Sequence, residues 1–421
     1  MDWRVWPYVG VEALRPEPSR FASLTGPGPL TVRKVQRHIV DRDSVLLQYF
    51  LGVTRSYVWA MTSRRAEVYA LPGRAQVECR VQAWLDGMAD GDAGGTRESG
   101  CRTAEDALAV SRMILGPVAS SLDRSRILIL ADGILHLVPF AALPRPDATS
   151  GGLVPLVVDH EVVNLPSSSV LGLPRQLWRR ADRWSRPVVV FADPVFEPDD
   201  PRLRARQGAA MPASGALVAR PRELPGPFRT HIPRLAESQC EAAGVQTTVP
   251  GTVVHLGFDA NRAAAEMPEL SNRRIVHFAT HAVVSDRYPQ MSGIVLSMFG
   301  RDGRVEDGFI PLHDICRLPL PVDLVVLSAC SRVPGPTRSG EGFLGLVRAF
   351  MHAGVRRMIA SLWRVDGTAR QALMVRFYQG LFERGLTPAA ALRAAQVDLL
   401  ASPRWGRSCD WAAFVLQGEW M

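Results

Sequence analysis

The stretch Asp323-Leu-Val-Val-Leu-Ser-Ala-Cys330 predicts the centre of the fold. Residues 324–327 form an unbroken apolar run rich in β-branched side chains, with prolines nearby on both sides, which is typical of a strand buried on both faces. Ser328, Ala329 and Cys330 are small residues at the carboxyl end of that strand. In open parallel α/β sheets, ligands bind outside the carboxyl ends of the strands. The pattern therefore puts the Cys330 thiol where a nucleophile can meet a substrate.

A second strand-like run, residues 274–279, leads into Thr280-His281-Ala282, and His281 precedes Cys330 by 49 residues (330 − 281). A free thiol has a pKa of about 8.5, so a cysteine nucleophile needs a base to form its thiolate near neutral pH. Neighbouring parallel strands that end in His281 and Cys330 would bring base and thiol together. Caspases have the same order, with the histidine about 50 residues upstream. We expect His281 to be the general base, and later the acid, and Cys330 to be the nucleophile.

Residues 277–281 (His-Phe-Ala-Thr-His) and 327–330 (Leu-Ser-Ala-Cys) resemble the two signature motifs of the CHAT family, caspase-like cysteine peptidases related to separases. The similarity runs from about residue 35 to the C-terminus. Two positions depart from the family pattern: Ala282 stands where glycine is usual, and Gly367 stands where a second aspartate often follows Asp366. Further stretches resemble the family in its own order: residues 132–143, 339–345, 348–350, 353–354 and 360–366.

The resemblance implies an α/β fold, with a caspase-like α/β/α sandwich and a mainly parallel sheet in residues 171–421. Strands that alternate with helices in that part indicate the same parallel βαβ units. By the resemblance, residues 31–170 form an inactive protease-like part of the CHAT region. Three strand-like runs in this part, residues 45–51, 56–61 and 66–71, predict antiparallel hairpins. Residues 1–30, rich in Pro, Gly and Trp, predict an extended arm.

The resemblance also implies roles for single residues. In caspase-like folds, the backbone N–H groups of the cysteine and of the residue after the histidine bind the oxyanion, here Cys330 and Ala282. If the backbone after His281 must take a positive φ, Ala282 restricts it more than glycine would. Asp366 and Glu341 are the predicted pocket residues, and a carboxylate at Asp366 would select Arg or Lys before the cut. The alternative for both is a carboxylate at a helix start, favoured by the helix dipole.

Composition narrows the function classes. The chain has 421 residues, of which 47% are hydrophobic and 21% charged, as expected of a globular protein. The net charge is +8, but the basic residues are scattered without interleaved aromatics, so we expect no direct nucleic-acid partner. The six cysteines form no CxxC pair, which indicates reduced thiols in a cytoplasm and neither a metal site nor a disulfide framework. No signal peptide and no run of the ~18–20 apolar residues that span a bilayer is found.

The leading functional hypothesis is a cysteine endopeptidase that forms an acyl-thioester with a protein or peptide substrate and needs no cofactor. A regulatory or sensor protein is expected to activate it, because an unregulated protease would harm its host. The resemblance suggests a role in bacterial antiviral defence. The alternative is a catalytically impaired caspase-like scaffold or binding protein, motivated by Ala282 and the Trp-bearing arm. A metal-dependent hydrolase is the third hypothesis, because His277 and His281 have the i, i+4 spacing that zinc peptidases use on a helix.

Overall fold

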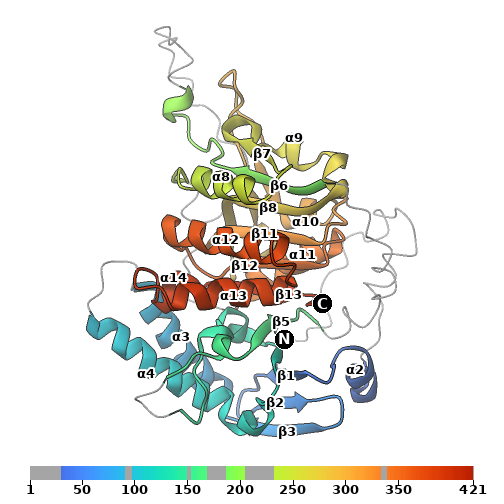
Figure 1. The fold of residues 1–421 in the computed structure, drawn as a ribbon, viewed down its shortest axis with the longest axis vertical. Helices are drawn as coiled ribbons and strands as arrows, with labels where there is room; N and C mark the ends of the chain where they lie inside the picture. Colours follow the sequence, from blue (N-terminus) through green and yellow to red (C-terminus); the bar gives the residue numbers. More distant parts are fainter. Residues whose placement is uncertain are drawn as a thin grey trace.

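A computed structural model describes residues 30–90, 97–148, 153–167, 186–203, 232–332 and 339–420 (Figure 1). For residues 89, 90, 97–103 and 330–332 only the backbone is described. The predicted arm, residues 1–30, lies outside the described part except for Leu30. No helix in the described part is both long and apolar enough to cross a membrane.

Within the described residues, thirteen strands form one sheet in the order β10-β9-β8-β11-β12-β13-β5-β4-β1-β2-β3, with β6 beside β8 and β7 outside β6. Mixed helices and a largely parallel sheet confirm the predicted α/β class. The strands are β1 (Ser44–Phe50), β2 (Ser56–Met61), β3 (Ala66–Leu71), β4 (Arg126–Leu130), β5 (Glu161–Asn164), β6 (Arg186–Ala192), β7 (Val253–Leu256), β8 (Arg273–Val284), β9 (Gly293–Val295), β10 (Phe309–Pro311), β11 (Leu324–Arg332), β12 (Arg357–Ser361) and β13 (Phe414–Gly418).

The sheet consists of two parallel blocks that run in opposite directions. The first block contains β7, β6, β8, β11 and β12, and β9 and β10 add antiparallel pairs at the end of β8. The second block contains β13, β5, β4 and β1, and β2 and β3 follow as the predicted antiparallel hairpins. The antiparallel pair β12–β13 joins the blocks. The expected boundary at residue 170 lies outside the described residues, and the sheet is continuous across the two parts.

Helices cover both faces of the first block. Neighbouring residues of a strand point to opposite faces, and on β8 His277 stacks on Tyr378 of α12 whereas Phe278 packs against Phe350 of α11. Helix α12 packs between α8 and α13 on one face, so α11 covers the other (Figure 1). The described helices are α2 (Val32–His38), α3 (Arg74–Asp90), α4 (Arg97–Ile114), α8 (Ser238–Thr248), α9 (Arg262–Ala265), α10 (Leu312–Ile315), α11 (Glu341–His352), α12 (Gly367–Phe382), α13 (Pro388–Leu400) and α14 (Ser408–Trp411).

Short 3₁₀ turns interrupt or shorten several elements. The valine-rich run 157–165 starts as a 3₁₀ turn and reaches the sheet only in β5. The helix that begins after Asn261 stops at Ala265, because Pro268 begins a separate turn. The described 3₁₀ turns are η3 (Gly116–Ser121), η4 (Gly133–Leu137), η5 (Phe140–Ala142), η6 (Leu156–Val158), η8 (Gly257–Asp259), η9 (Pro268–Asn272) and η10 (Pro289–Met291).

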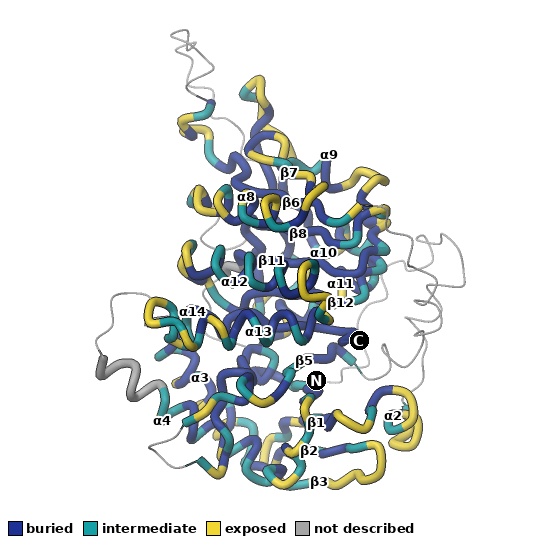
Figure 2. The backbone as a smooth tube through the Cα atoms, in the orientation of Figure 1, coloured by how far each residue is buried: buried dark blue, intermediate teal, exposed yellow. Residues whose placement is uncertain are grey.

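The core follows the central strands. Residues 324–329 of β11 are all buried, as are residues 275–284 of β8, so both strands lie inside the layered structure (Figure 2). Polar residues gather where these strands approach their carboxyl ends, at Thr280, His281 and Ser328. The predicted buried strand therefore lies at the centre of the first block, between β8 and β12.

Candidate active site

Strands β8 and β11 lie side by side in parallel register. Leu324 pairs with Ile275, and after a register shift Ala329 pairs with His281 and Cys330 with Ala282. Neighbouring strands are about 4.8 Å apart, so the backbones of His281 and Cys330 lie one residue out of step on adjacent strands. Both strands continue past these residues, to Val284 and Arg332, rather than ending at them as expected. The Cys330 side chain lies outside what the structure describes.

The register shift is a β-bulge. Between its pairings at Phe278 and His281, β8 has one more residue than β11 has between Leu327 and Ala329. An extra residue locally bends a strand and turns its side chains, and such bulges are common next to active sites. Here the bulge falls immediately before His281, so it helps to set the direction of that imidazole.

His281 is almost fully buried, with 2% of its surface exposed. Its Nε2 lies 2.7 Å from the backbone oxygen of Pro233. Because a carbonyl oxygen only accepts hydrogen bonds, Nε2 carries the proton in this contact, and in the neutral ring Nδ1 carries the lone pair. The ring also packs against Phe196, with centroids 5.2 Å apart. Both contacts orient the imidazole, and the hydrogen bond to Pro233 selects the tautomer.

Burial lowers the pKa of His281 to about 4, because the charged ring loses solvation. The hydrogen bond to Pro233 opposes this shift, whereas the charges of Arg364 and Arg370 add to it. The imidazole is therefore neutral at pH 7. A neutral, oriented imidazole can accept a proton from a thiol.

Pro233 is held in place by its neighbour Arg234. The guanidinium of Arg234 donates to the buried carboxylate of Asp193, with Nη2 2.7 Å from Oδ2. Arg202 donates to the same carboxylate at 2.8 Å, and the Asp193 N–H donates to Ser238 Oγ at 2.8 Å. Asp193 has φ +45°, the one positive φ among the described non-glycine residues. Its hydrogen bonds therefore hold the backbone in a strained conformation. No motif in the sequence indicated this role of Asp193.

A buried ionic cluster lies behind the two strands. Arg370 Nε of α12 donates to Glu241 Oε2 of α8 at 2.8 Å. His277 Nε2 lies 3.0 Å from Glu241 Oε1, although the alignment is poor for a hydrogen bond, and His277 Nδ1 lies 3.2 Å from the Tyr378 hydroxyl. Burial opposes ionisation of Glu241, but Arg370 and His277 outweigh it and lower its pKa to about 2. The cluster ties α8 and α12 to β8, four residues before His281.

His277 and His281 thus have different partners. The described residues contain no group of three or more His, Cys, Asp or Glu side chains placed to hold a metal ion. The third hypothesis, a metal-dependent hydrolase, gains no support from this part of the chain.

Ala282 lies within β8 in an extended conformation. It pairs with Cys330 on one side and with Ile294 on the other, and its φ is not positive. Any L-residue adopts such a backbone, so alanine in place of the family's glycine carries no backbone strain in this conformation. The N–H groups of Ala282 and Cys330 belong to adjacent, paired positions of the two strands.

Asp366 stands at the start of α12. Its Oδ1 accepts from the Thr368 N–H at 2.9 Å, the Thr368 hydroxyl at 2.6 Å and the Ala369 N–H at 3.2 Å. The carboxylate is therefore the N-cap of the helix, which was the alternative interpretation from the sequence. Glu341 is an exposed residue in the first turn of α11.

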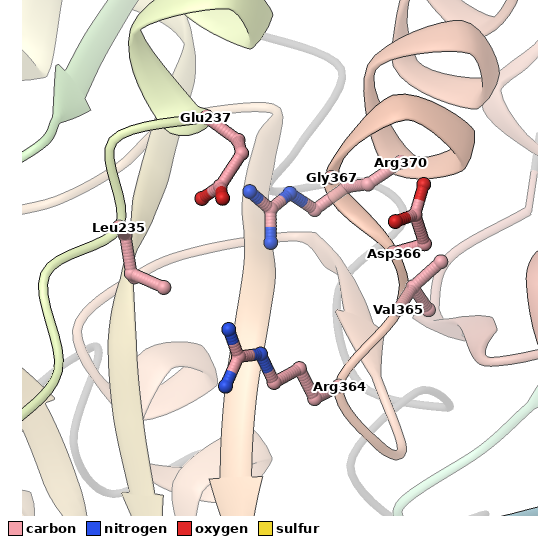
Figure 3. Close-up of a pocket in the computed structure, with 7 residues that line it drawn as sticks. All are labelled: Leu235, Glu237, Arg364, Val365, Asp366, Gly367 and Arg370. Atoms are coloured by element: carbon pink, nitrogen blue, oxygen red, sulfur yellow. The ribbon is translucent and has the colours of Figure 1, made fainter. Parts of the chain in front are cut away.

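A pocket of about 150 Å³ lies where the segment after β12 meets the segment before α8 (Figure 3). Asp366 is one of its wall residues, but its carboxylate points along α12, away from the guanidinium groups of Arg364 and Arg370 that face the pocket. Glu341 is not among the residues that line this pocket. The sequence had not indicated the two arginines, since isolated basic residues carry no recognisable spacing. The lining residues are Leu235, Glu237, Arg364, Val365, Asp366, Gly367 and Arg370.

Comparison with known proteins gives one family match. The family model described as CHAT domain matches residues 105–419. Tetratricopeptide repeat protein 28 from Homo sapiens is 35% identical over 106 residues, and its Mus musculus counterpart is 33% identical over the same length. Each alignment covers 25% of this chain and 4% of the relative, so the chain matches only a small part of these proteins.

Two solved structures of the Saccharomyces cerevisiae separase–securin complex are similar in fold. One has a TM-score of 0.50 at 8% identity and covers 92% of this chain and 30% of that chain. The other has a TM-score of 0.46 at 9% identity, with coverages of 92% and 31%. At such low identity the first likeness concerns the fold alone, and the chain spans about a third of the matched proteins.

Proposed function

The chain belongs to the CHAT domain family, and from this premise we propose that it is a cysteine endopeptidase with Cys330 as nucleophile and His281 as general base. The observation that carries the proposal is the parallel register of β8 and β11, in which Ala329 pairs with His281 and Cys330 follows at once. The neutral, buried and oriented imidazole supports it, because a general base must be unprotonated at working pH.

In the proposed reaction, His281 Nδ1 takes the proton of the Cys330 thiol, and the thiolate sulfur attacks the carbonyl carbon of the substrate. The N–H groups of Cys330 and Ala282 would stabilise the oxyanion. The intermediate then collapses to an acyl-thioester, and the imidazolium gives its proton to the departing amine. Water, deprotonated by His281, releases the acid and restores the thiol.

The role of Pro233 follows from the same geometry. Its carbonyl accepts the Nε2 proton, so it stabilises the imidazolium while Nδ1 is protonated. Asp193, through Arg234, holds this carbonyl in place. A backbone oxygen thus takes the orienting place that an aspartate side chain has in serine proteases.

The direct test uses purified full-length chain, a peptide library and a peptidyl acyloxymethyl ketone that alkylates active-site thiols. Cys330→Ala should abolish both cleavage and labelling. The matched control is Cys79→Ala, because Cys79 is exposed and lies on α3, beside the second block of the sheet. Equal cleavage and labelling by wild type and Cys330→Ala would refute the proposal.

Activity is proposed to depend on a protein partner. The name of one relative refers to tetratricopeptide repeats, and separase in the matched structures is in complex with securin. These names support a search for a partner protein and do not identify it. The cleavage test should therefore be repeated with proteins that co-purify with the Cys330→Ala chain from its host.

A second candidate function is a caspase-like scaffold with impaired chemistry. The observation in its favour is that Arg364 and Arg370 both disfavour protonation of His281, whereas catalysis requires the imidazolium transiently. Under this hypothesis a partner binds the wild-type chain as tightly as the Cys330→Ala variant, stays intact, and does not induce labelling by the ketone probe.

A further inference from the structure

We propose that the pocket between α8 and α12 binds an acidic side chain, Asp or Glu, of a peptide substrate, next to the scissile bond. The inference rests on the proposed function, because it names the substrate class of the same site. It reverses the expectation from the sequence that a carboxylate at Asp366 would select a basic residue.

The position of the pocket fits a substrate site. Strand β12 is the parallel neighbour of β11, and Arg364 follows its carboxyl end, at the edge of the sheet where ligands bind in such folds. Leu235 lies two residues after Pro233, which contacts His281. One wall of the pocket therefore belongs to the same segment that contacts the candidate base, and the charge of Arg364 acts on His281. Its volume of about 150 Å³ exceeds the ~30 Å³ share of one water molecule several-fold, so a short side chain can enter.

Arg364 supplies the charge for recognition. Its guanidinium faces the pocket, and it makes no hydrogen bond or ion pair with any described residue (Figure 3). Arginine presents planar donors that match a carboxylate with two parallel hydrogen bonds. An exposed guanidinium of this kind at a pocket wall can bind an anion without breaking an existing contact.

The second guanidinium adds donors to the same wall. Arg370 is only 2% exposed, and while its Nε binds Glu241, its Nη2 has no hydrogen-bond partner among the described residues. A buried donor without an acceptor is costly. An acidic ligand would lower that cost by placing negative charge beside it.

Neither carboxylate of the wall forms a hydrogen bond or ion pair with Arg364 among the described contacts. Asp366 is engaged by the N-terminal turn of α12. The Glu237 carboxylate points toward the guanidinium of Arg370 and lies across the pocket from Arg364 (Figure 3). Glu237 is expected to weaken binding of an acidic residue by repulsion, which offers a second, opposite test of the same idea.

The binding experiment uses the full chain with Cys330→Ala, so that no turnover occurs, and fluorescent peptides that differ only in a final Asp, Asn or Lys. We expect the Asp peptide to bind roughly tenfold more tightly than the Asn peptide. The energy of an ion pair at a protein surface lies between that of a pair in water and that of a buried pair. The difference should shrink with added salt.

Substitutions identify the residue responsible. Arg364→Gln should remove the Asp preference, Arg364→Glu should shift it to Lys, and Glu237→Gln should strengthen it. The matched control is Arg304→Gln, which removes the same charge from a side chain that is 87% exposed and outside the pocket. Equal binding of all three peptides, or an Asp preference that survives Arg364→Gln, would overturn the inference.

Cleavage measured in parallel separates this inference from the proposed function. If wild type cleaves peptides but binds acidic and neutral ones equally, the pocket assignment fails and the protease stands. If Arg364-dependent binding of the Asp peptide is found without cleavage or labelling, the pocket assignment stands and the protease fails.

Discussion

The two parallel blocks of the sheet use the carboxyl ends of their strands in opposite ways. In the first block, His281 lies in a strand beside Cys330, and Arg364 faces a pocket without a partner in the described part. In the second block, the groups after β1 and β4 satisfy each other. The Asp132 carboxylate accepts from the Leu51 N–H at 2.6 Å, and Arg74 Nη2 donates to the Leu51 oxygen at 2.6 Å.

The second block instead supports the first. After Asp132, the turn η4 brings His136 against Gly340, the residue that starts α11. A Cβ on Gly340 would lie 2.7 Å from the His136 Cβ and 2.9 Å from the Gly133 oxygen. The comparison teaches that similar architecture does not imply chemistry: the first block places a guanidinium at a pocket wall, and the second uses the polar groups after β1 and β4 in internal contacts.

The largest expected effect separates the buried His281 of the first block from the partly buried His136 of the second. His281→Ala should lower kcat/KM by about 10²–10⁴-fold, the usual contribution of a general base, whereas His136→Ala should leave activity per folded molecule nearly unchanged. Steady-state kinetics on samples matched for folded fraction by circular dichroism would measure this. Comparable losses of activity in both variants would remove the functional distinction between the blocks.

The pH dependence sharpens the same comparison. The folded-state pKa of about 4 for His281 lies below the unfolded value of 6.5, so the unfolded state binds more protons between these pH values. Stability is therefore fully present above pH 6.5 and falls as the pH approaches 4, by up to about 3 kcal/mol for this residue. Denaturant titrations of wild type and His281→Gln between pH 4 and 7 measure the free energy of unfolding at each pH. Equal slopes of this free energy against pH in the two proteins would contradict the assigned pKa.

The same pKa predicts that kcat/KM, measured as a function of pH, falls on the acidic side near pH 4. Arg364→Gln should move this fall to higher pH, because removing a nearby positive charge favours the imidazolium. An unchanged pH dependence would show that Arg364 does not act on His281.

Asp193 and Asp132 form a matched pair of carboxylates at strand ends. Asp193→Asn should cost about 2–3 kcal/mol, less than a fully buried ion pair because Arg202 and Arg234 are partly exposed. It should also lower kcat more than KM changes, through the Pro233 carbonyl. Asp132→Asn should affect stability alone. Chemical denaturation and kinetics of both variants decide this, and a normal kcat in folded Asp193→Asn would end its positioning role.

The smallest effect concerns the contact between the blocks. Gly340→Ala adds a methyl group where φ is +76° and the neighbouring backbone is close, which should cost about 1–3 kcal/mol. The control is Gly385→Ala, with φ +65° but open space around the position. Thermal unfolding should show a larger loss for Gly340→Ala, and equal losses would mean that contact with His136 adds nothing to the backbone strain.

Much of the fold was predictable because its elements are local. The run 324–327 predicted a central strand. Thr387 and Pro388 are the residue types typical of a helix N-cap and first position, and they begin α13. Gly385, with a positive φ, follows the end of α12, where glycine is common. The short strands β9, β10 and β13 carry too few residues for a pattern and depend on their neighbours.

Of the candidate site, only the residues that belong to recognised sequence motifs could be predicted. His281 and Cys330 could be placed on adjacent strands, and one of two interpretations of Asp366 proved to be its capping role. The carbonyl of Pro233 could not be predicted, because every residue has a backbone oxygen and only the three-dimensional path selects one. The bulge in β8 and the exposed guanidinium of Arg364 likewise depend on long-range packing.

Strand β13, which joins the two blocks of the sheet, has a consequence for folding during translation. It is translated long after Cys330, yet it joins the β12 edge to β5. We expect the two blocks to remain unjoined until residues 414–418 have left the exit tunnel, which would delay any proteolytic activity to that point. A chain truncated after residue 413 should therefore be cut more readily by added protease than the 421-residue chain, and equal resistance would contradict this role of β13.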